Sequence, residues 1–480
     1  MSTYERLTQP IAQARKGPQV AAFFDFDGTL LAGFSVFFFL YRRYLAGGIS
    51  VDEALSQAQA LFNYGSRKAD FNQLLKDFTA GMAGVPEQDM RALAAEVFRK
   101  DLAGRLYPEA RALVRAHQQQ GHTVVMVSSA TPYQLELAAD ELEIDHLVCT
   151  RLKLEAGYLT GEILGKPCYG VEKLHAAQLF AEQHQADLNE SYFYSDGAED
   201  IPLLEEVAHP RVLNPDKALS AYAEEAGWPV ERFSSRGIPG LADITRTGLV
   251  YGSFLPSFLL GAPAWLLNRS RRDVINFGLS AWAEFGSAVA GLNLRVEGEQ
   301  HLWEKRPAIF IFNHQSAVDV LVIARLMRRD FTGLAKAEMK KNPLLGPALS
   351  FAEAVFIDRE RKGDPAKAMR PAVERLEQGL SIVVAPEGQR SLGYRPGPFR
   401  KGAFHLAMQA GVPIVPIVIA NASDALPKSA LCIRPATIDV TVLPPISTRN
   451  WKAATLDQHV RACREKFLTA LGQSAEDAGG

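Results

Sequence analysis

The chain has 480 residues, of which 47% are hydrophobic and 22% are charged. This composition is typical of globular domains with sizeable cores, and it excludes a disordered, fibrous or disulfide-scaffold protein. The formal net charge is only −2, but residues 1–240 carry −10 and residues 241–480 carry +8. The asymmetry predicts two modules with different partners, and the basic half favours polyanions such as acidic lipid headgroups, nucleic acid or phosphorylated substrates.

The first half alternates strands and helices. The apolar run at residues 20–24 predicts a buried parallel strand, and helical periodicity follows over 34–105. Further strands are expected at 123–127 and 192–194, and polar residues follow both of them. This alternation predicts a doubly wound parallel sheet with polar groups at the carboxyl ends of its strands.

Two apolar segments lie near the middle of the chain. Residues 248–267 contain no charge, and residues 274–294 contain only Glu284. The first segment has the length of a membrane span, although its prolines and small residues weaken that reading. A core helix is the alternative for the second. Because arginines flank the segments, they favour a helical pair that dips into one leaflet over a clean span.

Strands and helices alternate again beyond residue 307, which predicts a second α/β domain. The expected fold is therefore α/β, with a doubly wound first domain that contains a helical insertion, an apolar helical pair, and a second α/β domain. The expected bounds are 18–235 for the first domain, about 34–105 for its cap, 236–246 for a linker, 247–294 for the helical pair and 295–470 for the second domain.

Two carboxylates, Asp25 and Asp27, lie two positions apart where the first strand is expected to end. The following loop can direct both at one ligand, so that one attacks as a nucleophile and the other transfers the proton of the leaving group. Their paired negative charge calls for a divalent cation, and oxygen ligands favour magnesium. A DxD motif standing alone, however, more often marks a simple turn after a strand.

Here other polar residues accompany the pair. Ser128 ends a later strand and can hydrogen-bond a phosphoryl oxygen, and Lys173 can neutralise that group. Asp196 and Asp200 add acidic oxygens at another strand end. In order and context, these residues resemble the motifs of the haloacid dehalogenase superfamily of phosphatases, in its phosphoserine-phosphatase-like branch with a helical cap.

The resemblance covers roughly residues 18–235. It implies that Asp25 forms an aspartyl-phosphate, that Asp27 is the acid/base, and that Asp25, the Asp27 carbonyl and Asp196 hold Mg²⁺. Phosphoserine phosphatases bind the charges of their substrate with a glutamate and an arginine, and this sequence has Phe34 and Phe78 at those positions. An apolar pocket cannot pair a zwitterion. The substitutions disfavour phosphoserine, whether the aromatic residues bind substrate or only pack the cap.

A second set of polar residues follows the strand expected at 309–312. His314 can deprotonate an alcohol, while Asp319 fixes its tautomer and stabilises the imidazolium. An H-x4-D pattern alone is weak evidence. Lys336, Arg359 and Arg390, however, are cations that can together bind a phosphate.

Apart from Lys336, which lies in LAKAEMKK, these residues belong to blocks of an ordered set of four: NHQSAVD, FIDR, PEGQRS and VPIVPI. The blocks resemble those of the 1-acylglycerol-3-phosphate O-acyltransferase family over roughly residues 245–450, with Gln389 in place of the usual threonine. The resemblance implies that His314 is the general base and Asp319 its partner. It further implies that Arg359, Glu387, Gly388 and Arg390 bind the acceptor phosphate and that a thioester donates the acyl group.

The sequence thus predicts a bifunctional enzyme that makes phosphatidic acid from lysophosphatidic acid and also hydrolyses a phosphomonoester with Mg²⁺. The expected partners are an acyl-CoA or acyl carrier protein donor and an anionic membrane surface, without nucleic acid. Four scattered cysteines and the absence of an apolar signal segment favour the cytoplasmic face of the cell membrane.

Three alternatives stay open at this point. The first domain can be a ligand sensor without turnover, or it can hydrolyse phosphoserine after all. The second half can be a polyanion-binding or membrane-binding module that transfers no acyl group.

Overall fold

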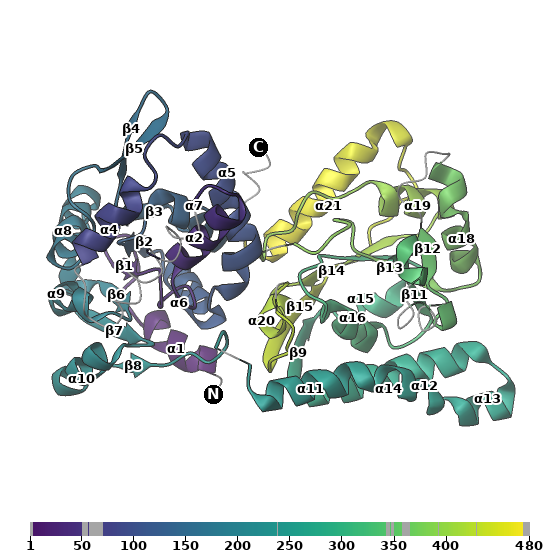
Figure 1. Cartoon of the computed structure of the whole chain (residues 1–480). Helices are drawn as coiled ribbons and strands as arrows, with labels where there is room; N and C mark the ends of the chain where they lie inside the picture. Colours follow the sequence, from purple (N-terminus) through teal and green to yellow (C-terminus); the bar gives the residue numbers. More distant parts are fainter. Residues whose placement is uncertain are drawn as a thin grey trace. The chain divides into compact units, whose positions relative to one another are not determined.

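The computed structural model describes residues 3–49, 56, 71–237, 239–341, 346, 350–357, 365–391, 393–428 and 430–473. It consists of two compact units, Met1–Ile238 and Pro239–Gly480 (Figure 1). Each unit contains a central sheet with a hydrophobic core on both of its faces.

The first unit is built on a six-stranded sheet in the order β3-β2-β1-β6-β7-β8, in which every pairing is parallel. The chain begins in the middle of the sheet and adds strands first on one side of β1 and then on the other. The strands are β1 (Ala21–Phe24), β2 (Thr123–Ser128), β3 (His146–Cys149), β6 (Tyr192–Ser195), β7 (His209–Leu213) and β8 (Val230–Glu231). The reversal of strand order at β1 places a crevice at the carboxyl ends of β1 and its neighbours.

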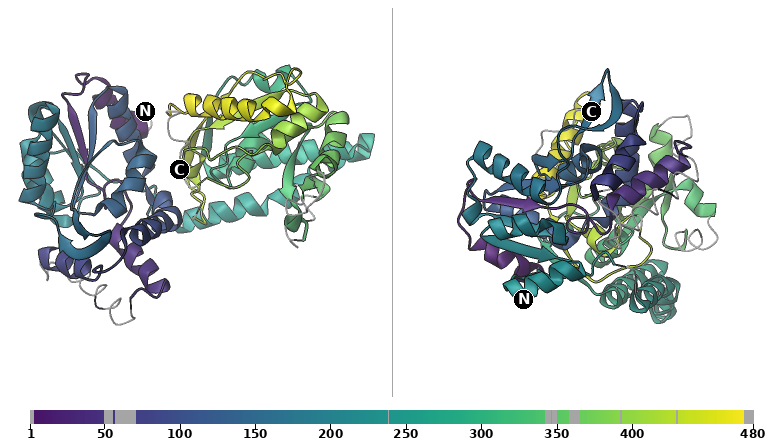
Figure 2. Two further views of the ribbon diagram at one scale, coloured as in Figure 1. Left: turned by 90° about the horizontal axis from the view of Figure 1, so that it is seen from above. Right: turned by 60° about the vertical axis from the view of Figure 1, so that its left-hand side comes forward.

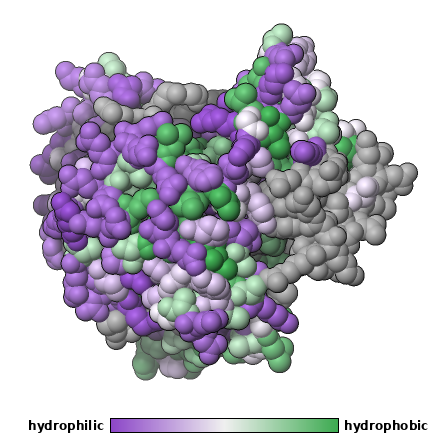
Figure 3. Space-filling view, turned by 90° about the vertical axis from the view of Figure 1, so that its left-hand side faces the viewer, coloured by the Kyte–Doolittle hydropathy of each residue, from purple (hydrophilic) through white to green (hydrophobic). Residues whose placement is uncertain are grey.

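Helices cover both faces of this sheet, as the left view of Figure 2 shows. Successive side chains of β1 point to opposite faces, so Ala22 and Phe24 join one core while Ala21 and Phe23 join the other. The first core includes helices α1 (Thr3–Ala12), α6 (Pro108–Gln119) and α7 (Pro132–Leu142), and the second includes α8 (Val171–His184), α9 (Ile201–Glu206) and α10 (Lys217–Ala226). The predicted doubly wound fold is confirmed. The outer face in Figure 3 is mostly hydrophilic, with small hydrophobic patches between polar side chains.

A helical cap is inserted between β1 and α6. Its described elements are α2 (Ser35–Leu45), α4 (Phe71–Ala80), α5 (Glu87–Val97) and two short turns, η1 (Phe98–Leu102) and η2 (Ala103–Arg105). Arg42 on α2 donates two hydrogen bonds to Asp101 on η1, at 2.7 and 3.0 Å, and thereby ties the ends of the cap together. An antiparallel hairpin, β4 (Leu152–Glu155) and β5 (Tyr158–Ile163), packs its second strand against α4, and short turns η3 (Leu188–Glu190) and η4 (Ala198–Asp200) flank β6.

The second unit has a seven-stranded sheet in the order β12-β11-β13-β10-β14-β15-β9. Only the β14–β15 pairing is antiparallel. The strands are β9 (Leu292–Glu297), β10 (Ile309–Phe312), β11 (Phe331–Lys336), β12 (Val355–Ile357), β13 (Ser381–Val384), β14 (Ile414–Ile419) and β15 (Ala436–Val442). This sheet confirms the predicted second α/β domain.

Helices on both faces of the second sheet complete that unit. One face carries α16 (Asp319–Met327) and the helical pair, and the other carries α18 (Pro365–Glu377), α19 (Gly402–Ala410) and α21 (Leu456–Ala470). The shorter elements are α15 (His301–Glu304), α20 (Ala422–Ala425), η5 (Ala337–Lys341) and η6 (Ala453–Thr455).

The apolar helical pair packs along the second unit. Three helices of its first arm, α11 (Leu241–Gly252), α12 (Phe254–Leu259) and α13 (Ala262–Asn268), lie against the single helix of its second arm, α14 (Arg271–Ala290) (Figure 1). The indole N–H of Trp282 donates to the Val250 carbonyl at 2.9 Å. A Cβ atom at Gly278 would lie 2.5 Å from the Phe258 ring, so only glycine allows this close approach of the two arms.

Both ends of the pair differ from the prediction. The first arm begins at Leu241, inside the segment predicted as a linker. The second arm ends at Ala290, because Gly291 adopts the left-handed conformation that terminates helices, and the following residues form β9 instead. Length and composition alone make Leu241–Asn268 a candidate membrane span, with a mean hydropathy of 1.4 and 22% of the segment buried.

Candidate active sites

The first candidate site lies where β1 and β6 end side by side. Asp25 follows β1 directly, and its backbone N–H donates to the Tyr194 carbonyl of β6 at 2.9 Å. Asp196 follows β6. Because parallel neighbours end at the same edge of the sheet, the two carboxylates come together although they are 171 positions apart in the sequence (196 − 25).

A buried lysine balances part of this negative charge. The Nζ atom of Lys173 on α8 lies 2.7 Å from Asp200 Oδ2 and 3.4 Å from Asp25 Oδ1. Burial alone would lower the pKa of Lys173, but the charges of Asp200 and Asp25 raise the pKa above its usual value. The Ser195 hydroxyl also donates to Asp200 at 2.7 Å, so the lysine is held in place by a carboxylate that is itself fixed.

The second carboxylate, Asp27, is bound by the start of the cap. The Ser35 backbone N–H donates to Asp27 Oδ1 at 2.7 Å, and the Ser35 hydroxyl donates to Oδ2 at 3.0 Å. Gln134 on α7 donates to the Ser35 hydroxyl at 2.8 Å. Burial raises the pKa of Asp27 to about 7, although the bond from the Ser35 N–H opposes the shift. The sequence analysis missed Ser35 and Gln134, because only the folded cap brings them to Asp27.

Ser128 is the remaining predicted residue of this site. It ends β2, next to β1, and its side chain is buried. Its hydroxyl accepts a hydrogen bond from the Ala130 N–H at 3.3 Å, and burial raises the pKa of Asp25 while a hydrogen bond from Ser128 opposes that rise. The structure therefore brings together all the residues predicted for the first site.

The donor set of this site fits a divalent cation. Burial raises the pKa of Asp25 to about 6 and the pKa of Glu199 to about 7, and the neighbouring charges of Asp196 and Asp200 belong to the same cluster. Among the described residues, Lys173 is the cation that forms ion pairs with this cluster, to Asp25 and Asp200. The excess negative charge, carried entirely by oxygen atoms, suits Mg²⁺.

The geometry also limits how a cation can be held. Asp196 lies so close to Gly28 that a Cβ atom there would be 1.9 Å from its Oδ2, and the φ of +78° at Gly28 also favours glycine. Within the described residues, no three side chains of His, Cys, Asp or Glu are arranged as a metal site. A cation would therefore combine the carboxylates of Asp25 and Asp196 with a backbone carbonyl.

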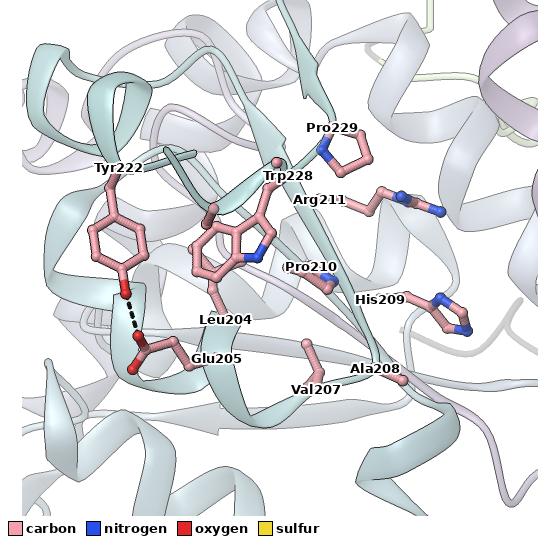
Figure 4. Close-up of a pocket in the computed structure, with 12 residues that line it drawn as sticks. Leu204, Glu205, Val207, Ala208, His209, Pro210, Arg211, Tyr222, Trp228 and Pro229 are labelled. Carbon is pink, nitrogen blue, oxygen red and sulfur yellow. Dashed lines mark hydrogen bonds between the residues drawn. The ribbon is translucent and has the colours of Figure 1, made fainter. Parts of the chain in front are cut away.

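A cavity of about 560 Å³ lies elsewhere in the first unit (Figure 4). Its lining includes His209 and Arg211 at the start of β7, together with Tyr222 and Trp228 from α10 and the turn after it. The cavity therefore lies at the amino end of β7, whereas Asp25 and Asp196 follow the carboxyl ends of their strands. For this reason, we do not assign the chemistry of the first unit to this cavity.

The second candidate site is centred on His314, which follows β10. The distance between His314 Nδ1 and Asp319 Oδ2 is 2.7 Å. Asp319 is fully buried, whereas the His314 side chain is 24% exposed. A carboxylate accepts hydrogen bonds, so Nδ1 carries the proton and Nε2 carries the lone pair. The predicted pair of histidine and aspartate is therefore present, with one nitrogen of the ring available as a base.

Backbone amides fix Asp319 in turn. The N–H groups of Gln315 and Ser316 donate to Asp319 Oδ2 at 2.8 and 2.9 Å. Burial raises the pKa of Asp319, and the bond from His314 opposes this shift. Asn313 joins the loop to β14 through two hydrogen bonds of 2.8 Å with the backbone of Ile419. The sequence analysis gave no role to Asn313 or Gln315.

Glu387 follows β13 and contacts the histidine loop. Its Oε1 accepts from the His314 N–H and its Oε2 from the Gly397 N–H, both at 2.8 Å. Burial raises the pKa of Glu387 to about 7, and these two N–H groups oppose the shift. The next residue, Gly388, has a φ of +77°. This conformation lets the chain turn sharply beneath His314.

Of the three predicted phosphate-binding cations, only Arg390 has its side chain in the described part of the structure. The Arg390 carbonyl accepts a hydrogen bond from Lys428 Nζ at 3.0 Å, and Arg390 lies in the same loop as Glu387. Lys336 ends β11, but its side chain lies outside the described part of the structure. Arg359 also lies outside the described residues.

Comparison with known families agrees with the two sites. Residues 22–205 match the family model of haloacid dehalogenase-like hydrolases, and residues 293–420 match the acyltransferase family model. The 1-acyl-sn-glycerol-3-phosphate acyltransferase of Limnanthes douglasii is 34% identical over 203 residues, which cover 42% of this chain and 69% of the relative.

Solved structures resemble each unit at lower identity. The 1-acyl-sn-glycerophosphate acyltransferase of Thermotoga maritima is 22% identical, with a TM-score of 0.38, and the match covers 48% of this chain and 98% of that one. A phosphoserine phosphatase solved as an analogue of its phospho-aspartyl intermediate is 17% identical, with a TM-score of 0.35, and the match covers 44% and 91% of the two chains.

The family models and the plant relative confirm both resemblances predicted from the sequence. The first unit matches the haloacid dehalogenase-like hydrolase model, and the chain belongs to the 1-acyl-sn-glycerol-3-phosphate acyltransferase family through its second unit.

Proposed function

We propose that the chain is a bifunctional enzyme of phospholipid synthesis. Its second unit would transfer an acyl group from a thioester to 1-acyl-sn-glycerol-3-phosphate, and its first unit would hydrolyse a phosphomonoester. The observation that best supports the proposal is the 2.7 Å contact between His314 and a fully buried Asp319, at the end of a strand. This arrangement leaves a histidine nitrogen free to accept a proton.

In the proposed transfer, His314 Nε2 removes the proton from the free hydroxyl of the acceptor. The hydroxyl oxygen then attacks the thioester carbonyl, a C–O bond forms, the C–S bond breaks, and the thiol leaves with a proton. Asp319 keeps the proton on Nδ1 and stabilises the imidazolium that forms. The donor would be acyl-CoA or an acylated carrier protein.

Arg390 and Gly388, in the loop beside His314, would bind the phosphate of the acceptor. A guanidinium matches phosphate geometry, and a glycine allows a close approach to the backbone. The sequence motif assigns Arg359 to the same task, and Lys336 is a further cation that could join it. Only the motif implies that Glu387 binds the phosphate as well. In the structure, its two oxygens accept hydrogen bonds from backbone amides.

Replacing His314 tests the proposed base. We expect His314→Ala to reduce acyl-transfer turnover by at least about 10²-fold, because general-base catalysis contributes that much or more. The acceptor KM should change little. Consumption of the thioester by the full-length protein gives the measurement, and His405→Ala, at an exposed histidine of α19, is the matched control. Near-normal turnover in His314→Ala would contradict the assignment.

In the proposed hydrolysis, an Asp25 oxygen attacks phosphorus and the bond to the leaving oxygen breaks. Asp27 gives its proton to that oxygen and later takes a proton from the water that hydrolyses the aspartyl-phosphate. Ser128 and Lys173 would hold the phosphoryl oxygens. Mg²⁺, held by Asp25, Asp196 and the Asp27 carbonyl, would supply positive charge that reduces repulsion between the carboxylates and the phosphate.

The nucleophile assignment separates an enzyme from a ligand-sensing domain. We expect Mg²⁺-dependent phosphate release to fall by at least about 10²-fold in Asp25→Asn, because the amide forms no bond to phosphorus. Asp145→Asn, at an exposed aspartate of the same unit, should release phosphate normally. If the wild-type chain binds phosphomonoesters but releases no phosphate with Mg²⁺ present, the sensor alternative holds instead.

The cap supports a hydrophobic substrate for this hydrolysis. The Phe34 side chain is 52% exposed and precedes Ser35, the residue that binds Asp27. Phe37 contacts Phe34 edge-on, with ring centroids 6.2 Å apart, and is also exposed. Phe78, in contrast, is buried in the core of the unit and therefore packs the cap. We infer that Phe34 contacts the apolar part of a lipid phosphomonoester.

A charge at this position should change the substrate preference. The full-length protein should hydrolyse lysophosphatidic or phosphatidic acid with a higher kcat/KM than phosphoserine. Phe34→Glu should reduce the ratio of these two kcat/KM values about 10-fold, because burial of a phenylalanine ring strengthens binding by that factor or more. Tyr44→Glu, at the far end of α2, is the control and should preserve the preference. A wild-type preference for phosphoserine would overturn the lipid substrate.

The helical pair supports a position on the membrane surface. Its packed side contacts the second unit, while Leu259, Leu266 and Leu267 are 74%, 65% and 89% exposed. The guanidinium of Arg269 lies 4.3 Å from the centre of the Trp265 ring, a combination suited to the interface between acyl chains and headgroups. We infer that the pair lies in one leaflet, with its packed side toward the cytoplasmic catalytic unit.

Charges on the exposed leucines should release the protein from lipid. We expect the triple variant Leu259→Glu, Leu266→Glu and Leu267→Glu to bind anionic vesicles at least about 10²-fold more weakly, because each buried leucine contributes about 1.5–3 kcal/mol. A matched triple variant replaces Leu154, Leu164 and Leu179, which are exposed leucines of the first unit. Vesicle sedimentation measures binding, and equal binding of the two variants would refute the proposed membrane contact.

A further inference from the structure

The carboxylate of Glu387 is fully engaged by backbone amides. The side chain is buried, with 5% of the residue exposed, and its two oxygens accept the N–H groups of His314 and Gly397 at 2.8 Å each. Hydrogen bonds between a carboxylate and N–H donors are stronger than neutral ones. Glu387 therefore bridges two loops that are distant in sequence.

The loop that carries Glu387 also binds the backbone carbonyl of His314. The Ser391 N–H and hydroxyl donate to the His314 carbonyl at 2.7 and 3.1 Å. The side chain is held separately by Asp319. Both backbone polar groups and the Nδ1 atom of His314 thus have fixed partners, which determines the direction of its Nε2 atom.

The far end of the bridge is anchored to a long helix. Arg464 on α21 donates to the carbonyl oxygens of Pro396 and Gly397 at 3.0 and 3.2 Å. Burial lowers the pKa of Arg464, and the negative charge of Glu387 opposes this shift. The His314 loop is therefore connected to α21 through Glu387 and the turn at Gly397.

A ligand of the acceptor phosphate would need different properties. A carboxylate repels a phosphate, and turning Glu387 toward one would leave two buried N–H groups without their acceptor. We propose that Glu387 is a positioning residue, which holds the His314 loop on the second unit and acts on the reaction only through His314. The proposal rests on the proposed function of His314, and it removes Glu387 from the phosphate-binding residues that the motif implies.

Steady-state kinetics of the full-length protein tests this role. In Glu387→Gln, the amide keeps one acceptor oxygen but presents an NH₂ group to the other backbone N–H. We expect kcat to fall about 10- to 100-fold, because small displacements of a catalytic group have effects of this size. The KM for the acceptor should change by less than about 3-fold. Glu374→Gln, at an exposed glutamate of α18, is the matched control. A large rise in the acceptor KM with kcat preserved would overturn the proposal.

Kinetics of a double variant separates this proposal from the assignment of His314. In the His314→Ala background, Glu387→Gln should cause no additional loss of residual turnover, because a residue that acts through His314 has nothing left to act on. An additional 10-fold loss would overturn the proposal.

Hydrogen exchange provides a readout that does not depend on activity. Glu387→Gln should accelerate amide exchange in peptides that cover residues 309–316 and 393–400, whereas exchange in α14 should stay unchanged. Unchanged exchange in the first two peptides would also overturn the proposal. If His314→Ala keeps full activity while exchange accelerates as expected, the proposed base is wrong and the bridge by Glu387 stands.

Discussion

A carboxylate that leaves water must find hydrogen-bond donors or a cation, and both sites of this chain are arranged around that requirement. In the second unit, backbone N–H groups meet it. Asp319 accepts from two amides and His314, all through Oδ2, while its buried Oδ1 has no hydrogen-bond partner among the described residues, and Glu387 accepts from two amides through its two oxygens. In the first unit the described carboxylates outnumber the cations that contact them. Lys173 neutralises part of the cluster, and the remaining negative charge suits a cation that arrives from outside.

This difference separates two ways of preparing a catalytic group. His314 is held by fixed dipoles, so its geometry is set before any substrate binds, as expected for a base that must meet a hydroxyl. Asp25 and Asp196 lie close together without full compensation, and this repulsion favours binding of a positively charged ion. The cap adds a further control, because Ser35 binds Asp27 directly and belongs to the helix that presents Phe34. Ser35 therefore links the Asp27 carboxylate to the exposed aromatic residue that precedes it.

Much of this arrangement was predictable, because apolar strands followed at once by polar residues have a strong sequence pattern. Asp25 after one strand and His314 after another fall at the carboxyl ends of parallel strands, where a doubly wound sheet collects its polar groups. What could not be predicted depends on backbone atoms and on distant contacts. The pairing of Ser35 with Asp27 requires the folded cap, and the role of Glu387 depends on two N–H groups that no side-chain pattern reveals. The end of α14 could likewise not be predicted from apolar composition, because the left-handed conformation of Gly291 determines it.

The position of β9 has a consequence for how the second unit forms. This strand follows the helical pair directly, yet it is the edge strand of the sheet, and its one neighbour is β15, near the end of the chain. During synthesis, β9 therefore cannot form its hydrogen bonds until almost the whole unit, including β15, has been made. Strand pairings between segments so far apart in the sequence form slowly. The helical arms need only each other for their first contacts, since α11, α12 and α13 pack on α14 within about 50 residues of chain. The apolar arms can thus fold while the sheet of the second unit is still open.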